Sequence, residues 1–171
     1  LDNCYKSKYV EDCLSRNDAI GWVKASDYLR MWYLYNEGGI YLDADTEVLK
    51  PFGLELLSCH LFACQEDNGF VANGIIGAEK GHPVIKRCLD VMDTLDGKSD
   101  KVFENGMEVW NYELDKFGDG QWVKDKILHI KDPKQICIYP QEYFLPYNHE
   151  TGITNITDNS YTTHRYLKSW K

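Results

Sequence analysis

The stretch 22–43 contains a helix pattern, a glycine pair and a strand pattern in direct succession. Apolar residues recur at the i, i+4, i+7 spacing of one helix face, namely at Ala25, Leu29 and Trp32. Gly38-Gly39 stands where a helix C-cap belongs. The apolar run 40–42 then predicts a short strand that ends at Asp43. This succession favours folds in which a helix packs directly on the strand that follows it.

Strand and helix patterns alternate along the rest of the chain. We predict strands at 47–49, 61–64, 71–78 and 136–139, and helices at 82–95 and 102–117. Asn73-Gly74 predicts a tight turn or bulge inside the strand 71–78, and 148–160 reads as a polar loop. No internal repeat or linker interrupts this order, so residues 1–171 are expected to form a single α/β domain.

The charge balance excludes some classes of partner. The chain has 19 Lys and Arg against 27 Asp and Glu, a net charge of −8. It therefore lacks the basic surface that a nucleic-acid partner requires. No apolar run reaches the roughly 20 residues of a membrane span, and the first residues do not resemble a signal peptide. We expect a cytoplasmic protein without a transmembrane segment, which could still lie peripherally at a membrane.

The six cysteines form no CxxC pair and have no zinc-type spacing. Three of them lie in apolar runs, where a thiol acts as a small hydrophobic side chain: Cys64, Cys88 and Cys137. We therefore expect reduced cysteines. The even cysteine count and the sequon Asn155-Ile156-Thr157 leave a disulfide-bonded protein of the secretory lumen as the alternative.

Two carboxylates, Asp43 and Asp45, follow the predicted strand 40–42. At i and i+2 on extended backbone they would point the same way, at a strand end where α/β sheets bind ligands. Such a pair could hold Mg²⁺ or Mn²⁺ against a diphosphate. In the preceding helix, Asp27 and Arg30 lie at i and i+3 and can pair. They are either a surface ion pair or groups that bind sugar hydroxyls and phosphate oxygens.

The segments 25–30, 34–35 and 38–45 together read SDYxRxxxLYxxGGIYLDxD. This pattern resembles the glycosyltransferase sugar-binding region that contains the DxD motif. That family includes fungal initiating mannosyltransferases, bacterial capsule and lipopolysaccharide glycosyltransferases and, more distantly, clostridial-toxin glucosyltransferase domains. The resemblance continues in 73–78 and in Gly81-His82-Pro83, and ends with the "H…SW" signature of His164 and Ser169-Trp170.

The resemblance implies an α/β fold of the GT-A-like, nucleotide-sugar-binding (Rossmann-like) type, a mixed sheet flanked by helices that lacks its N-terminal strand in this chain. It implies that Asp45 is the main metal ligand and that Asp43 contacts ribose, sugar or metal. Asp27 and Arg30 would hold the donor, and Asn73 would face the sugar. The other residues expected to contact the donor or its metal are Ser26, Tyr41, His164, Ser169 and Trp170.

By the same resemblance the protein would be a retaining glycosyltransferase that depends on Mn²⁺ or Mg²⁺. It would move a sugar from a UDP- or GDP-sugar to a glycan or lipid-linked acceptor in polysaccharide synthesis. We expect residues 161–171 to close over the donor as a flap. Asn105-Gly106-Met107 stands where relatives often have a Thr-Gly-Pro-like turn, and we assign no role to it.

Two other functions remain open from the residues. A strand followed by Asp-x-Asp-Thr also resembles the nucleophile loop of haloacid-dehalogenase-like, Mg²⁺-dependent phosphatases, although no Asp-Asp pair follows downstream to complete their metal site. A non-catalytic carbohydrate-binding module would also account for the many Tyr and Trp residues.

Overall fold

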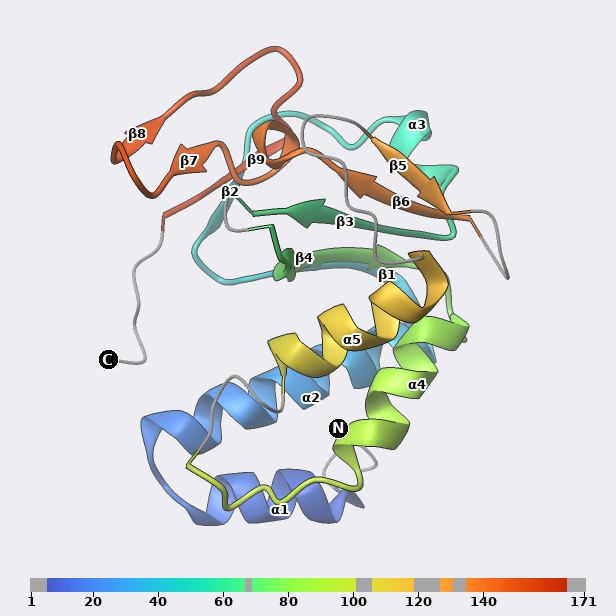
Figure 1. Cartoon of the computed structure of the whole chain (residues 1–171), viewed down its shortest axis with the longest axis vertical. Coiled ribbons are helices and arrows are strands. Elements are labelled where there is room, and N and C mark those ends of the chain that lie inside the picture. Colours follow the sequence, from blue (N-terminus) through green and yellow to red (C-terminus); the bar gives the residue numbers. More distant parts are fainter. Residues whose placement is uncertain (1–5, 67–68, 101–105, 119–126, 131–134, 166–171) are drawn as a thin grey trace.

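The computed structural model describes residues 6–66, 69–100, 106–118, 127–130 and 135–165. Its centre is a five-stranded sheet in the order β1-β4-β3-β6-β5 (Figure 1). The strands are β1 (Gly39–Leu42), β3 (Leu61–Gln65), β4 (Val71–Ala78), β5 (Leu128–Ile130) and β6 (Ile136–Tyr139). β3 and β6 run parallel and the other neighbours antiparallel, so the sheet is mixed.

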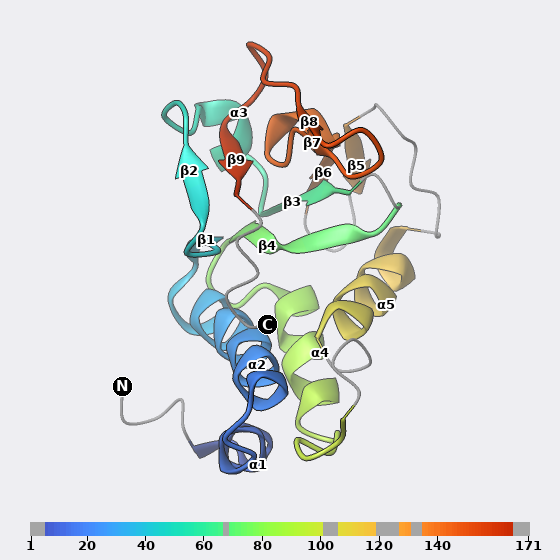
Figure 2. The same cartoon turned by 90° about the vertical axis from the view of Figure 1, so that its left-hand side faces the viewer.

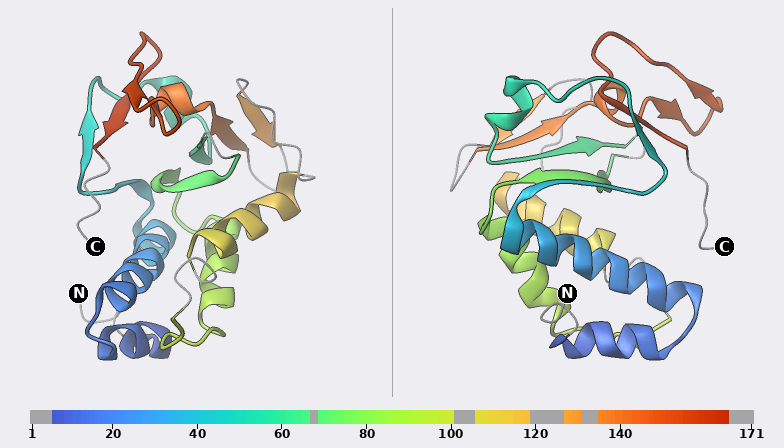
Figure 3. Two further views of the ribbon diagram at one scale, coloured as in Figure 1. Left: turned by 60° about the vertical axis from the view of Figure 1, so that its left-hand side comes forward. Right: turned by 180° about the vertical axis from the view of Figure 1, so that it is seen from behind.

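Helices cover one face of this sheet, and smaller elements cover the other (Figures 1 and 2). The helical layer contains α2 (Ala19–Glu37), α4 (Pro83–Met92) and α5 (Met107–Gly118), with α1 (Lys8–Ser15) packed on α2. The opposite side carries α3 (Leu54–Leu57), the 3-10 helix η2 (Gln141–Tyr143), and two strand pairs (Figure 3): β2 (Thr46–Val48) with β9 (Thr162–His164), and β7 (Tyr147–Asn148) with β8 (Ile153–Thr154).

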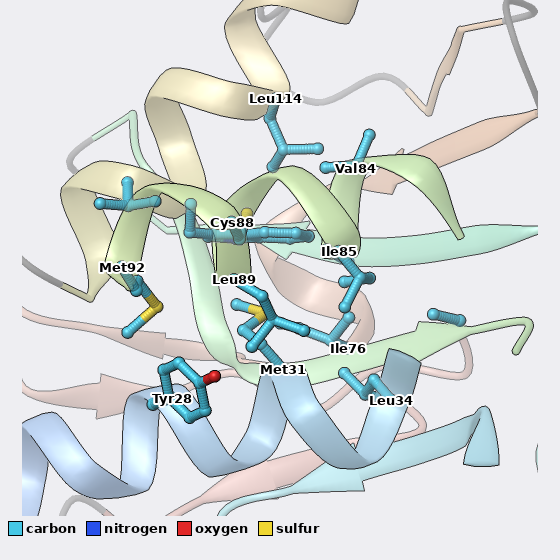
Figure 4. Packing of buried hydrophobic residues seen from close by; sticks show 14 of the residues in the cluster. Tyr28, Met31, Leu34, Ile76, Val84, Ile85, Cys88, Leu89, Met92 and Leu114 are labelled. Atoms are coloured by element: carbon cyan, nitrogen blue, oxygen red, sulfur yellow. The ribbon is translucent and has the colours of Figure 1, made fainter. Parts of the chain in front are cut away.

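The core is split by the sheet into two clusters, as the alternation of side chains along a strand requires. In β3, Leu61 and Ala63 join the cluster under the helices, whereas Phe62 and Cys64 join the cluster on the other side. Figure 4 shows the first cluster, where side chains of α2, α4 and α5 meet Ile76 of β4. The helical layer therefore packs directly on β4.

The predicted fold class is confirmed: this is an α/β protein with a mixed sheet flanked by helices. Helix α2 begins earlier than predicted, because Asp18 caps it by accepting a hydrogen bond from Gly21 N at 2.8 Å. It ends as predicted at Gly38, whose φ of +69° suits a glycine. The loop predicted at 148–160 instead contributes to the β7 and β8 pair. Across the described residues, no helix is long and apolar enough to cross a bilayer.

The expectation of reduced cysteines is wrong for Cys59 and Cys137, which form a disulfide. The parallel pairing of β3 with β6 sets Phe62 opposite Cys137 and brings Cys59 within reach. The sequence hides this contact because 78 positions separate the two cysteines. Cys13, Cys64 and Cys88 are free and buried, in line with the expectation.

This disulfide predicts the outcome of a thiol titration. Protein isolated without reductant and then denatured should yield two fewer reactive thiols than the same protein after reduction. Replacing Cys59 by serine should remove most of this difference, because Cys137 then has no partner. Equal titres before and after reduction would show that the pair is reduced.

His82 predicts a pH dependence of stability. Its Nδ1 accepts the N-cap hydrogen bond from Val84 N at 3.3 Å, and burial together with nearby His60 lowers the pKa of His82 to about 4. The unfolded chain takes up this proton near pH 6.5, whereas the folded chain does so only near pH 4. Stability is therefore full above pH 6.5 and should fall by up to about 3 kcal/mol as the pH drops towards 4.

Asn at position 82 can still cap α4 but does not titrate. Urea unfolding of both proteins at pH 7 and pH 4.5 should therefore show a steeper acid loss in the wild type than in His82→Asn. Parallel pH profiles would mean that His82 titrates normally in the folded protein.

Candidate functional site

The two acidic residues of the DxD motif lie in a turn between β1 and β2. Thr46 N donates to the carbonyl oxygen of Asp43 at 3.0 Å, which closes the turn. The expectation of extended backbone at 43–45 is therefore wrong, because the chain turns here between β1, which belongs to the central sheet, and β2, which pairs with β9 (Figure 2). The turn nevertheless brings the carboxylates of Asp43 and Asp45 together.

Strand β9 supplies a third polar group to this turn. The β2 and β9 register sets His164 opposite Thr46, and Arg165 N donates to the Asp45 carbonyl at 3.0 Å. His164 Nε2 then lies 2.9 Å from Asp45 Oδ1 and 3.6 Å from Asp43 Oδ2. The structure thus brings together the three residues predicted as metal ligands.

This trio fits a divalent cation. One donor atom from each of Asp43, Asp45 and His164 lies within 4.8 Å of the others, and all three side chains are half-buried. Two carboxylates with one imidazole form a donor set that suits Mn²⁺ and also accommodates Mg²⁺. Burial opposes the charge of Asp43, but the neighbouring His164 and the charge of Arg30 lower the pKa of Asp43 below its usual value. It is therefore ionised at neutral pH, as a cation ligand must be.

Arg30 is the centre of a second, deeper cluster. Its Nη1 donates to the carbonyl oxygen of Asn73 at 2.7 Å and lies 3.3 Å from Asp43 Oδ1. Its Nη2 lies 3.1 Å from Asp27 Oδ1, which also accepts a hydrogen bond from Asn73 Nδ2 at 3.0 Å. Its Nε is buried and has no hydrogen-bond partner among the described residues. The predicted pair Asp27 and Arg30 is therefore buried, and the surface interpretation is wrong.

The charges of this cluster depend on one another. Burial raises the pKa of Asp27, whereas Arg30 and the amide of Asn73 favour its charged form. Burial also disfavours the charge of Arg30, but the carboxylates of Asp27 and Asp43 outweigh it and raise the pKa of Arg30. Removing Arg30 would leave the buried Asp27 without its cationic partner, whereas Arg30 would still face Asp43 if Asp27 were removed.

Tyr41 forms one wall of the deeper cluster. Its ring lies under the guanidinium of Arg30, with Arg30 Cζ 4.6 Å from the ring centroid. Its hydroxyl donates to Asp43 Oδ1 at 2.8 Å. Burial raises the pKa of Tyr41 to about 12, and a hydrogen bond from Ser26 opposes this shift. Ser26 and Tyr41 thus lie beside the DxD turn, and their contact with the donor stays a prediction.

The C-terminal residues differ from the expected flap. Tyr161 and Thr162 are buried, Thr162 Oγ1 donates to the Phe144 carbonyl at 2.7 Å, and His164 is held in β9. The prediction of a closing flap is therefore wrong for residues 161–164, because pairing with β2 builds them into the fold. Ser169 and Trp170 lie outside the described residues.

Two glycines beside the clusters were not predicted as site residues. A Cβ on Gly74 would lie 2.6 Å from Asp43 Oδ2, and a Cβ on Gly106 would lie 1.7 Å from Asp27 Oδ2. Each glycine therefore lets backbone approach a site carboxylate closely. Asn73-Gly74 carried a signal, since it predicted a bulge, but nothing in the sequence around Gly106 indicated its contact with Asp27.

Known proteins resemble the chain in sequence and in fold. Residues 5–63 match the family model described as "Glycosyltransferase sugar-binding region containing DXD motif". The solved structure titled "PaToxG Glycosyltransferase" is 28% identical, with a TM-score of 0.54 over 66% of this chain. The chain spans only 40% of the length of that protein. No curated protein matches it. The chain is therefore similar to glycosyltransferases with a DXD sugar-binding region, in sequence over residues 5–63 and in fold, and its own DxD turn lies at Asp43 to Asp45.

Proposed function

We propose that this protein transfers a sugar from a nucleoside diphosphate sugar to an acceptor hydroxyl and requires a divalent cation. The observation that carries the proposal is the position of Asp43 between the two clusters. Its Oδ1 faces Arg30 and Tyr41, and its Oδ2 faces His164 of the cation cluster. A diphosphate at the cation would therefore lie beside a buried set of groups that can bind a sugar.

The residues of the deeper cluster are suited to hold the sugar. Arg30 Nε is a buried donor with no partner among the described residues, and a sugar hydroxyl would satisfy it. The carboxylate of Asp27 and the amide of Asn73 offer further hydrogen bonds in fixed positions. Because these groups are held by one another, they would orient the sugar without reorganising.

The cation cluster is suited to hold the diphosphate. Asp43, Asp45 and His164 would bind Mn²⁺ or Mg²⁺, which when bound supplies positive charge that stabilises the departing diphosphate. Arg30 adds a second positive charge on the sugar side of Asp43. Together the two clusters account for cleavage of the bond between sugar and diphosphate.

The family resemblance supports further details of the proposal. We propose a UDP- or GDP-sugar as donor, a glycan or lipid-linked acceptor in polysaccharide synthesis, and retention of the sugar's configuration. Ser169 and Trp170 remain proposed donor contacts from the sequence alone.

The phosphatase alternative is disfavoured by the contacts of Asp43. A nucleophilic carboxylate needs a free oxygen, but Oδ1 accepts from Tyr41 and lies against Arg30, and Oδ2 faces His164. The neighbouring His164 and the charge of Arg30 outweigh burial and lower the pKa of Asp43, which weakens it as a nucleophile.

The Cys59 and Cys137 disulfide supports an oxidising compartment over the cytoplasm as the site of folding. Asn155 of the sequon is exposed, which is compatible with a glycan there. We therefore propose the secretory or extracellular environment that the sequence left as an alternative.

One experiment separates the three functions. The protein is incubated with UDP- and GDP-sugars and Mn²⁺, and nucleoside diphosphate release is measured with and without a chelator. We expect release from a subset of donors, lost on chelation. Binding of sugar without release would favour a carbohydrate-binding module, and phosphate release from phosphomonoesters would favour the phosphatase.

A further inference from the structure

We propose that Trp110 and Asn111 of α5 are positioning residues, which set the place of Asn73 and through it the sugar-facing pair Asp27 and Arg30. This inference rests on the proposed function for the meaning of the cluster. The contacts that carry it are independent of that function.

Strand β4 departs from regular pairing beside the site. Its register with β3 passes from Ala63 opposite Ile76 to Gln65 opposite Val71. Residues 72–75 of β4 therefore lie opposite the single β3 residue Cys64. Backbone groups in such an irregular segment lack their ladder partners and must be satisfied in another way.

Side chains bind the backbone of Val71, which precedes this segment, and of Ala72 and Asn73 within it. Asn111 Oδ1 accepts from Val71 N at 2.8 Å, and its Nδ2 donates to the Val71 carbonyl at 3.1 Å. Trp110 Nε1 donates to the carbonyl of Ala72 at 3.2 Å. Arg30 donates to the next carbonyl, that of Asn73. The carbonyls of three consecutive residues thus accept hydrogen bonds from side chains. Two of these side chains belong to α5.

The two α5 side chains that bind β4 are buried and fixed in position. Trp110 is fully buried and Asn111 is 8% exposed. Asn111 Nδ2 also donates to the Met107 carbonyl one turn earlier in α5, at 2.9 Å, which fixes its amide plane. Because the backbone at 71 and 72 cannot shift, Asn73 presents its amide to Asp27 in one place.

The beginning of α5 contacts the other side of the same cluster. Gly106 precedes α5 and lies so close to Asp27 that a Cβ there would overlap Oδ2. The carbonyl of Gly106 accepts from Trp110 N at 3.1 Å, so it forms the first turn of the helix with the residue that holds Ala72. Helix α5, together with the glycine that precedes it, therefore contacts both Asp27 and the strand segment that carries Asn73.

The test compares Asn111→Leu with Glu113→Gln in the intact chain. Leucine fills a similar volume but leaves both backbone groups of Val71 unpaired. Glu113 is another buried polar residue of α5, but it pairs with Arg87 and Lys116 and not with β4. Glu113→Gln therefore controls for a general weakening of α5.

We expect Asn111→Leu to lower kcat/KM for the donor sugar about 10- to 100-fold, the effect of a small misplacement of a binding group. Affinity for the nucleoside diphosphate with Mn²⁺ should change less than about twofold, since the cation cluster is held by β2 and β9. Equal losses of nucleoside diphosphate and donor sugar affinity would overturn the positioning role. Trp110→Phe, which removes one donor and keeps an aromatic ring, should show the same selective loss in milder form.

A double-mutant cycle tests whether Asn111 acts through Asn73. If it does, Asn111→Leu should have little further effect on kcat/KM in an Asn73→Ala background, whereas Glu113→Gln should have the same effect in both backgrounds. Additive losses for Asn111→Leu and Asn73→Ala would show that Asn111 acts independently.

A measurement without substrate separates this inference from the proposed function. The side-chain amide resonances of Asn73, assigned by their loss in Asn73→Ala, should shift in Asn111→Leu and Trp110→Phe and stay in place in Glu113→Gln. Unchanged resonances in the first two variants would overturn the inference. If the protein transferred sugar from none of the donors, only the proposed function would be overturned.

Discussion

Replacing Asp45 by asparagine is expected to abolish cation-dependent donor binding and to lower sugar transfer by about 10³-fold, the upper range for loss of one charge-stabilising group. Asn keeps the volume of Asp but removes the negative charge that a hard cation requires. The fold should survive, because Arg165 N bonds to the backbone carbonyl of Asp45, and the amide oxygen of asparagine can keep the contact that Asp45 Oδ1 makes with His164.

The measurement is donor binding by calorimetry at increasing Mn²⁺, with circular dichroism to check the fold. Asp90→Asn is the matched control, since Asp90 pairs only with Lys86 on the exposed side of α4 among the described contacts. It should leave binding and transfer unchanged. A Mn²⁺ dependence that survives in Asp45→Asn would remove Asp45 from the cation site.

The sequence predicted the local part of this site well. Helix α2, the glycine cap and β1 follow from spacing and turn chemistry within 25 residues, and they place Asp27, Arg30 and Asp43 on adjoining elements. Local patterns determine such neighbours because few residues separate them. The family pattern added Asn73 and His164, which no spacing rule links to the DxD motif.

The features that the sequence could not predict depend on pairing between strands that lie far apart in the chain. The disulfide depends on the parallel alignment of β3 with β6, and the place of His164 depends on the pairing of β2 with β9. Pairing of distant strands is set by the whole packed structure, to which residues 161–164 contribute as a strand and not as a flap. The contact of Gly106 with Asp27 is likewise a product of how α5 packs on β4.

Burial changes the free energy expected for the ion pair of Arg30 with Asp27. On a helix surface its i, i+3 pair with Asp27 would contribute a few tenths of a kcal/mol. Buried, the same pair carries a desolvation cost that its partners must offset. The protein retains it beside the DxD turn, where an unpartnered Nε can serve a ligand. Apolar side chains could replace a whole buried ion pair without loss of stability, so its presence beside the DxD turn is an argument for a role in function.

Arg30→Lys is therefore expected to lower kcat/KM for the donor by about 10²-fold, the effect of losing a positioned charge-assisted donor. The guanidinium of Arg30 contacts the Asn73 carbonyl, Asp27 and Asp43, and it lies over the ring of Tyr41. One ammonium cannot reach these acceptors together, nor stack as a planar group. Arg30→Ala should in addition destabilise the fold by about 3 to 5 kcal/mol, because Asp27 is then buried without its partner.

The matched control is Arg87→Lys, where the arginine is half exposed and makes its ion pair with Glu113 outside the site. Lysine can retain that single contact, so stability and transfer should change little. Donor kinetics and urea unfolding of both variants distinguish the possible roles of Arg30. If Arg30→Lys transferred sugar as fast as Arg87→Lys, the guanidinium would be needed only to balance the charge of Asp27. A selective loss at Arg30, with stability kept by the lysine, would show that the fork geometry serves the donor.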